Sequence, residues 1–392
     1  MTKIKLPCFP PRKARNTPTL INFVVNWLVK FQVVSNPIPT NSSFNLKSRL
    51  KLLLLTALDR TSISRKARDL REQDTLIPSG EATLAWLKTS SIDEITISQQ
   101  NGFLQFLDSL PDSFQRARKQ GMLLAIDYHM DPNYAKTLSN YIRGGKKKAS
   151  THQFYQYLTV IWVNAPEPIT LGVQLIPRKY STLKTVQNLL GSLIKHERIV
   201  GLLADGDFYN YDVIKWLIQK HIFFTIRGRV NSGVKPLVQK YHEELYQKKE
   251  FVFVDYQMNK GHTRKHIPVK LVLYKEGRDI FALIVPPTCQ LSGTQIRELY
   301  RRRFMIETYY RQMHRFQIFS CSQHPAVRYI MVLLAFWLCN FWSYFKTPLN
   351  FLKTTSRRCR ADFVYTANDF CEFLVTSWHR ARFRRQEVFS RG

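Results

Sequence analysis

Three carboxylates stand out because of the residues around them. Asp127 follows the apolar run "LLAI" and Asp205 follows "VGLLA", so both are expected where a buried strand emerges into solvent. Glu307 is the single acid in "YRRRFMIETYYRQMHRF", a stretch with five arginines. Each aspartate alone also fits a turn or a cap. Three converging carboxylates, however, would suit two Mg²⁺ ions, which prefer oxygen ligands and together promote chemistry at a phosphate.

The stretch around Glu307 is predicted to be one helix with a functional face. At 100° per residue, four side chains lie within about 40° of Glu307 around the axis: Tyr300, Arg303, Arg311 and His314. Arg301 points well away from them. This stripe would present an acid flanked by groups that bind phosphate. The alternative is an exposed face on which Glu307 makes i,i+4 salt bridges with Arg303 and Arg311, each worth only a few tenths of a kcal/mol.

The segments before Glu307 predict a mixed sheet covered by helices. Strands are expected at "MLLAIDYHM", "HQFYQYLTVIWV" and "PITLGVQLIP", followed by the helix "STLKTVQNLLGSLIKH", the strand "RIVGLLAD" and the amphipathic helix "YDVIKWLIQK". After "HIFFTIRGR", three more strands are expected at "FVFVDYQ", "VKLVLYK" and "DIFALIVPP". This order indicates an α/β domain with an added β-rich segment.

Short helices are predicted in the first 120 residues. They cover "LKSRLKLLLLTALDR", "SISRKARDLREQ" after a Thr61 or Ser62 cap, and "GEATLAWLKT" after a Ser79 cap. Three such helices with basic polar faces resemble a helix-turn-helix arrangement, which would lay one helix in a DNA groove. Any small helical bundle gives the same pattern, so both interpretations stand.

The overall charge favours a polyanionic partner. The 392 residues include 59 Lys and Arg against 28 Asp and Glu, a formal net charge of +31 spread along the chain. Nucleic acid is therefore the favoured partner, with ribosomes or anionic membranes as the alternative. The apolar run 329–345 has 17 residues, short of the ~20 that span a bilayer, and is predicted to be a buried core helix, with no membrane partner. The six cysteines lack metal-ligand spacing and are interpreted as reduced thiols of a cytoplasmic protein, and no signal peptide is predicted.

Several motifs resemble one enzyme family. The spacing of Tyr300, Arg303, Glu307 and position 314 is similar to the signature of DDE transposases of bacterial or archaeal insertion sequences, whose third acid lies in a Tyr, Arg, Glu, Lys motif. "LLAIDYHMDPNY" and "LLADGDFYN" resemble the segments of their first and second acids, and "GGKKKASTHQFYQYLTV" resembles their hairpin into the second strand. The resemblance runs from about Met122 to Phe345.

The resemblance implies an RNase H-like catalytic domain. In it Asp127 and Asp205 would lie on adjacent strands and Glu307 on a helix, holding two Mg²⁺ ions, for which Mn²⁺ can substitute. The partners implied are double-stranded DNA, both the terminal inverted repeats of the element and the target, and a second copy of the chain as a homodimer on DNA. A nucleoid-associated location in the cytoplasm follows. The side chains expected to contact DNA phosphates are Tyr300, Arg303, Arg311, His314, Lys146, Lys147 and Lys148.

The expected organisation has four parts. Residues 1–120 would form a helical DNA-binding region, 121–228 and 292–346 the RNase H-like catalytic domain, 229–291 a β-rich insertion and 347–392 a basic C-terminal tail. The expected activity is metal-dependent cleavage and transfer of DNA strands. A catalytically inactive DNA-binding relic and a structure-specific nuclease of the same fold are the alternatives.

Three details stay open in the sequence. His314 stands where the family usually has Lys, although Arg311 and Arg315 are near enough to supply the charge. Asp207 would share a face with Asp205 if the strand continued that far, but Asp205 is preferred because it directly follows the buried run. The lysines at 146–148 fit a loop that binds the DNA backbone and, equally, a solvated turn.

Overall fold

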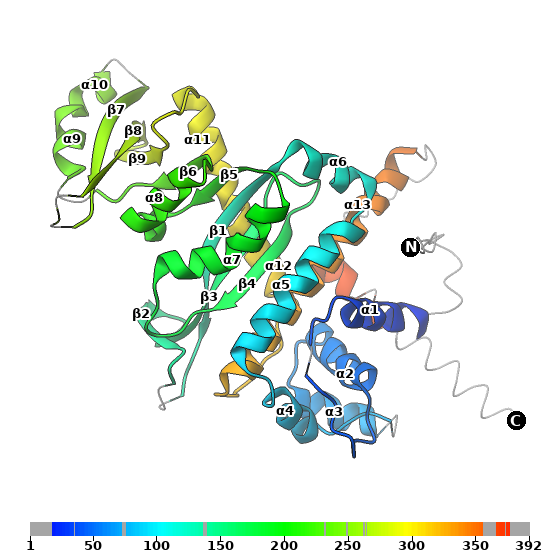
Figure 1. Ribbon diagram of the computed structural model, residues 1–392. Coiled ribbons are helices and arrows are strands. Elements are labelled where there is room, and N and C mark those ends of the chain that lie inside the picture. Colours follow the sequence, from blue (N-terminus) through cyan, green and yellow to red (C-terminus); the bar gives the residue numbers. More distant parts are fainter. Residues whose placement is uncertain are drawn as a thin grey trace, which may run out of the picture.

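A nine-stranded mixed sheet forms the centre of the computed structural model (Figure 1). The structure describes residues 18–355 and 366–376, except positions 35, 73–75, 136–138, 231–232, 248–249, 262, 264 and 373. The strand order is β2-β3-β1-β5-β6-β9-β8-β7, and β4 pairs with β3. The strands are β1 (Met122–Pro132), β2 (Ile142–Lys148), β3 (Thr151–Trp162), β4 (Ile169–Leu175), β5 (Ile199–Ala204), β6 (Phe224–Arg227), β7 (Phe251–Asn259), β8 (His266–Glu276) and β9 (Asp279–Val285).

The first half of the sheet has the pairing expected of the predicted catalytic domain. β4, β3 and β1 are antiparallel neighbours, whereas β1, β5 and β6 are parallel. Parallel neighbours need a crossover, and α7 (Thr182–His196) and α8 (Tyr211–Gln219) precede β5 and β6. The strands and helices predicted for this half are present. The arrangement is a mixed α/β sheet with flanking helices, compatible with an RNase H-like domain.

The β-rich segment predicted before the last helices continues this same sheet. β9 pairs antiparallel with β6 through Ile226 with Ile284 and Arg227 with Leu283, and β8 and β7 follow outward. Two short helices, α9 (Lys235–Lys240) and α10 (His242–Gln247), accompany these strands at one end of the molecule (Figure 1). The three strands were predicted from their apolar runs, but their pairing with β6 depends on contacts distant in sequence.

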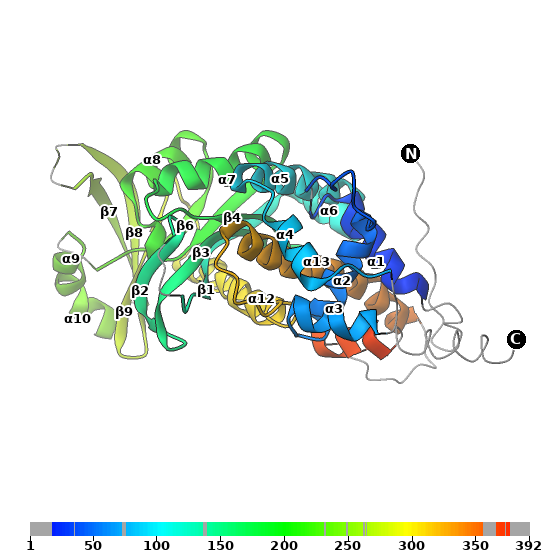
Figure 2. The same ribbon diagram turned by 90° about the horizontal axis from the view of Figure 1, so that it is seen from below.

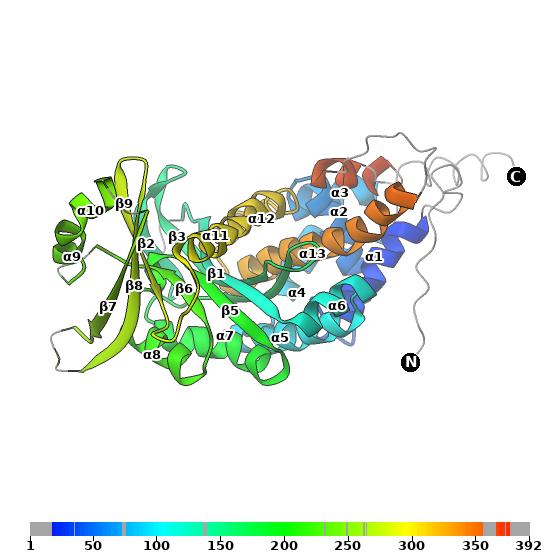
Figure 3. The same cartoon turned by 90° about the horizontal axis from the view of Figure 1, so that it is seen from above.

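Helices lie on both sides of the sheet (Figures 2 and 3). On one side, α7 contacts β3 and β4, and Leu189 packs directly against Gly172 of β4. On the other side, α12 (Met305–Met313) contacts β1 and α13. α13 (Pro325–Thr355) also packs against β4 and contains the apolar run 329–345. The predicted catalytic residues at the sheet's edge are therefore supported from both faces.

The described residues before β1 form six helices, twice the number predicted. They are α1 (Pro18–Lys30), α2 (Leu46–Leu58), α3 (Ile63–Arg71), α4 (Gly80–Leu87), α5 (Ile92–Ser109) and α6 (Asp112–Gln120). The caps at Ser62 and Ser79 are confirmed, because each hydroxyl accepts a backbone N–H three residues later. Helices α1, α5 and α6 were not predicted, although Ser91 and Glu94 form a capping box at the start of α5.

The apolar run in α13 is a core helix, as predicted. By length and composition Pro325–Lys346 is apolar enough to cross a membrane, but 94% of its most apolar window is buried inside the protein. Trp337 stacks on Phe103 of α5 with ring centroids 4.4 Å apart and meets Trp27 of α1 edge-on at 5.4 Å. These contacts give the N-terminal helices and the sheet one continuous core. Of the predicted tail 347–392, positions 356–365 and 377–392 lie outside the described residues.

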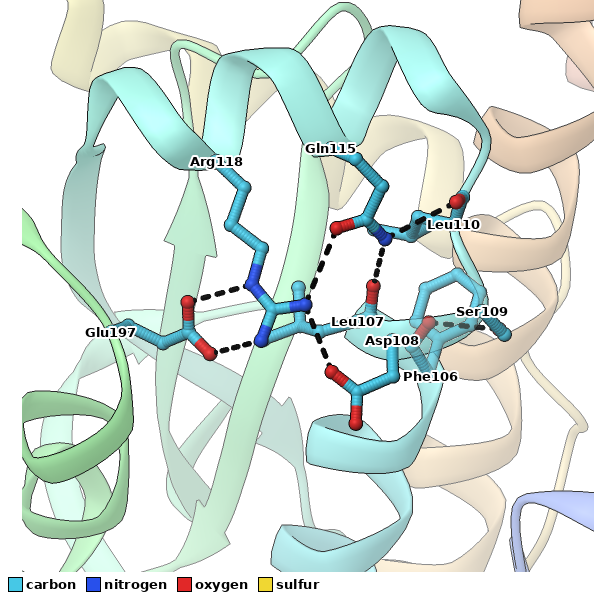
Figure 4. A network of polar contacts seen from close by, with 8 residues as sticks. All are labelled: Phe106, Leu107, Asp108, Ser109, Leu110, Gln115, Arg118 and Glu197. Atoms are coloured by element: carbon cyan, nitrogen blue, oxygen red, sulfur yellow. Dashed lines mark hydrogen bonds and ion pairs between the residues drawn. The ribbon is translucent and has the colours of Figure 1, made fainter.

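A partly buried network of ion pairs links the segments that precede β1 and β5 (Figure 4). Arg118 of α6 donates Nε and Nη2 to the two carboxylate oxygens of Glu197, at 2.7 and 2.5 Å, and donates Nη1 to Asp108 at 2.9 Å. β1 begins just after α6, and β5 begins two residues after Glu197. A bidentate guanidinium–carboxylate pair is geometrically specific, so it holds these strands in register.

Candidate active site

Asp127 and Asp205 occupy equivalent positions relative to the parallel pairing of β1 with β5. Asp205 directly follows β5, as expected, but the expectation that β1 ends at Asp127 is wrong, because pairing with β3 continues β1 to Pro132. The last register pair of β1 and β5 joins Ile126 to Ala204, and each aspartate is the next residue. The carboxyl ends of parallel strands meet at one edge of a sheet, where α/β folds place ligand sites. The buried runs that marked the two acids in the sequence therefore bring them side by side.

The local structure distinguishes Asp205 from Asp207. β5 ends at Ala204, so the strand does not continue through Asp207, and a short 3₁₀ turn, η1 (Gly206–Phe208), follows. Asp205 caps this turn by accepting the backbone N–H of Asp207 at 2.9 Å. Asp207 instead forms an ion pair with Arg229 at 2.7 Å, and its side chain is 52% exposed. Asp205, and not Asp207, is therefore the acid in register with Asp127.

Arg303 links the first acid to the third. Its Nη1 lies 3.6 Å from Oδ2 of Asp127 and its Nη2 lies 3.1 Å from Oε1 of Glu307. The Arg303 side chain is only 9% exposed, whereas that of Glu307 is 53% exposed. The i,i+4 salt bridge of the surface interpretation is present, but its arginine is buried against a second acid. Among the described ion pairs, Glu307 has none with Arg311.

The helix around Glu307 is not the regular helix that was predicted. α11 (Gly293–Arg301) and α12 are joined by a 3₁₀ turn, η2 (Arg302–Phe304), and α12 ends before His314. A 3₁₀ turn advances more than 100° per residue, so the predicted stripe is wrong as a single face. Arg311 is exposed and donates to Thr308, and His314 contacts Gln317 at 2.7 Å. Tyr300 and Arg303 are buried together, and Arg301 points away to Glu276.

The two aspartates are electrostatically costly in this arrangement. Burial and, next to it, the negative charge of Asp205 together raise the pKa of Asp127 to about 7, although Arg303 opposes both effects. Burial also raises the pKa of Asp205. Paired carboxylates that repel each other are typical of functional sites, where a cation or a proton relieves the repulsion.

A cavity of about 410 Å³ opens beside Asp205. Its polar lining consists of Asp205, Asp207, Arg227, Arg229, Tyr300 and Arg303. We call it the Asp205 cavity. Arg227 and Arg229 were not predicted as site residues, although the "IRGR" that ends and follows β6 would have drawn attention to them. Three arginines around one carboxylate pair give a cavity suited to an anion.

The remaining predicted DNA contacts lie away from the Asp205 cavity. Lys146, Lys147 and Lys148 are exposed, but they belong to strand β2 and not to a loop, because the hairpin turns at Ala149 and Ser150. His314 lies beside buried His129, with ring centroids 5.2 Å apart. These residues and Arg311 are therefore not lining residues of the cavity in this conformation.

The donor set at the strand ends suits a divalent cation only in part. Among the described residues, no group of three His, Cys, Asp or Glu side chains is placed to hold a metal ion. Asp127 and Asp205 fit such an ion, because both are oxygen donors and repel each other at adjacent positions. Glu307 is turned toward Arg303 and would have to leave that guanidinium to join them.

A search of curated proteins finds no match. The family model described as "Transposase DDE domain" matches residues 113–338, more than half of the chain, and spans all three acids, the β7–β9 segment and most of the buried part of α13. The match covers the part of the sheet whose carboxyl edge holds Asp127 and Asp205. The chain therefore belongs to the DDE transposase domain family.

Proposed function

We propose that this protein cleaves the DNA at the ends of an insertion sequence and joins it to a target, with Asp127, Asp205 and Glu307 as the catalytic acids. The observation that carries the proposal is the register of β1 and β5, which places two partly buried aspartates side by side with Arg303 against one of them. The order and spacing of the acids match the Tyr, Arg, Glu, Lys subtype, with His314 in place of the lysine.

The three acids would hold two Mg²⁺ ions, or Mn²⁺ in their place. Bound there, the metals supply Lewis-acid stabilisation and activate an attacking oxygen. The chain's own residues position the DNA. Tyr300 and Arg303 line the Asp205 cavity, where a guanidinium can bind a phosphate by a bidentate fork. On binding DNA, Arg303 would exchange Glu307 for a phosphate, which would free Glu307 to join the other two acids.

The partner is proposed to be double-stranded DNA, bound by a homodimer in the nucleoid. The net charge of +31 supports binding to a polyanion. Helix α3 carries Arg65, Arg68 and Arg71 on its exposed positions and packs between α2 and α4. This helix is our candidate for recognition of the terminal repeats, and Lys146, Lys147 and Lys148 are candidates for contacts with the flanking backbone.

The alternatives differ in what the acids do. An inactive relic would keep the charged surface without a working site, and a structure-specific nuclease would cut without joining. The geometry favours a working site over a relic. Placing two repelling carboxylates together out of full contact with water has a free-energy cost, and DNA binding alone does not require that arrangement.

The test is metal-dependent cleavage and strand transfer of the element's terminal DNA. Asp127→Asn and Glu307→Gln should each lower both activities by on the order of a thousandfold or more, because each removes a ligand charge with little change in volume. DNA affinity measured without metal should stay within about twofold. Wild-type rates in either variant would refute the assignment. Cleavage without joining by the wild-type protein would support the nuclease instead.

A further inference from the structure

A second cavity adjoins the Asp205 cavity on the opposite face of the sheet. Its volume is about 270 Å³, and its lining includes Tyr128, Met130, Arg143, Phe154, Gln156 and Tyr180, together with Asp207 and Arg229. We call it the Gln156 cavity. Asp207 and Arg229 line both cavities, so their ion pair forms the border between them. Tyr128 and Met130 alternate with Asp127 along β1 and therefore point to the other face.

Two polar groups of the Gln156 cavity lack hydrogen-bond partners. The Oε1 atom of Gln156 is buried and accepts no hydrogen bond, and Gln156 is only 6% exposed. The Nη1 atom of Arg143 is likewise buried without a partner. An unpaired buried polar group costs about 1–3 kcal/mol, so such groups are retained where a ligand satisfies them. One unpaired acceptor and one unpaired donor therefore belong to two residues that line the same cavity.

Planar side chains also line this mainly polar cavity. The Arg143 guanidinium stacks on the Tyr180 ring, 4.5 Å from its centroid, and Tyr128 stacks on Phe208 with centroids 4.8 Å apart. Phe154 is buried, and Met130, which pairs with Gln156 across the strands, is 36% exposed. Aromatic rings, a guanidinium plane and a flexible thioether are the surfaces on which planar rings pack.

We propose that the Gln156 cavity binds one unpaired nucleobase of the DNA strand whose phosphate occupies the Asp205 cavity. A side-chain amide presents a donor and an acceptor side by side, which matches the edge of a base, and Tyr180 with Arg143 offers a stacking surface. The volume is slightly below the ~300–1,000 Å³ of pockets for drug-sized ligands and so suits a single ring system. The assignment of the neighbouring phosphate rests on the proposed function.

The chain contains a matched control for Gln156. Gln174 lies on β4, next to β3, and points to the same face, because it pairs with Leu158 and Leu158 pairs with Tyr128. Its Oε1 is also buried without a partner, but it lines a different cavity between α5 and α7. Gln156→Leu and Gln174→Leu therefore remove the same chemical group from two sites, and thermal unfolding shows whether both variants fold.

The experiment measures the affinity of the full-length protein for two single-stranded probes at one fixed salt concentration, without metal. One probe is an eight-nucleotide DNA with bases, and the other is the same backbone with every base replaced by an abasic site. Equal backbone charge cancels the phosphate contribution. The wild-type protein should prefer the probe with bases by about tenfold. Gln156→Leu should reduce this preference about fivefold, and Gln174→Leu by less than twofold.

Two results would overturn the base site. One is equal affinity of the wild-type protein for both probes, and the other is equal preference in the two folded leucine variants. Because no cleavage is measured, the result is independent of the catalytic proposal. A protein that cleaves terminal DNA but does not distinguish the probes refutes only the base site. One that distinguishes them through Gln156 but does not cleave supports the base site and refutes only the catalytic roles.

Discussion

Two regions of this fold differ in whether their polar side chains are satisfied within the protein: the core around Asn340 and the edge of the sheet that holds Asp127 and Asp205. In the core, Asn340 of α13 is fully buried and satisfied: its Oδ1 accepts the backbone N–H of Thr170 at 2.8 Å and the Tyr309 hydroxyl at 2.6 Å, and its Nδ2 donates to the Thr170 carbonyl at 2.9 Å. At the carboxyl end of the parallel pairing of β1 with β5, Asp127 and Asp205 lie partly buried beside each other, and the pKa of Asp127 is raised to about 7. The core network adds stability, whereas the strand ends hold charge that a ligand can relieve.

The largest effect is expected for the loss of one charge from the carboxylate pair, and it concerns the rate of strand cleavage. Asp205→Asn should abolish strand cleavage, by on the order of a thousandfold or more, because it removes a charge from the paired carboxylates. Its thermal stability should be equal to or above that of the wild-type protein, since the repulsion with Asp127 is removed. Asp207→Asn, which loses an exposed ion pair, should retain most of the activity. The opposite ranking of the two variants would make Asp207 the second acid.

A core substitution should do the reverse. Asn340→Ala leaves the Thr170 backbone groups and the Tyr309 hydroxyl without partners, so the free energy of unfolding should fall by roughly 3 kcal/mol or more. Cleavage per folded molecule should be unchanged. Chemical denaturation measures the loss, with exposed Asn101→Ala on α5 as the control. A change below 1 kcal/mol, about the effect of a surface substitution, would show that the network is not a stabilising one.

Arg303 and Arg301 allow a buried cation to be compared with an exposed one that is close to it in sequence. Arg303→Ala should lower cleavage by on the order of a hundredfold, the scale of one preorganised charge contact. Arg301→Ala removes only an exposed pair with Glu276 and should lower it by less than twofold. Rates should be measured at equal bound DNA, with thermal unfolding to verify folding. Equal small losses would return Arg303 to a structural role.

The smallest effect concerns the pH dependence of stability in metal-free buffer. Because its folded-state pKa is raised to about 7, Asp127 keeps a proton that the unfolded chain releases near pH 4, so its contribution to stability falls as pH rises between these values. Asp127→Asn should gain on the order of 2 kcal/mol relative to the wild-type protein between pH 5 and pH 7. Denaturation at each pH measures this, with exposed Asp279→Asn as the control. If the free energy of unfolding changed with pH in the same way in the wild-type protein and in Asp127→Asn, the Asp127 carboxylate would already be neutralised.

Much of the site's framework could be predicted from local patterns. The apolar runs located β1 and β5, and the acids after them are at equivalent positions of those strands. The catalytic roles of these acids and the domain boundaries remain predictions. The prediction of one regular helix around Glu307 was wrong, because η2 interrupts it. Arg303 of η2 contacts Asp127, a residue distant in sequence. They also missed α5, whose polar positions obscured its apolar face although its capping box was readable.

Periodicity and composition act over a few residues or over the whole chain, so they located most strands of the sheet, the two acids that follow the buried runs of β1 and β5, and the excess of positive charge. Contacts between residues distant in sequence set which strands pair, how β9 extends the sheet through β6, and which of several arginines is buried. Arg301 and Arg303 have the same chemistry and nearly the same sequence position. One is exposed and the other is buried between two acids, because burial depends on the neighbours that packing brings from elsewhere in the chain.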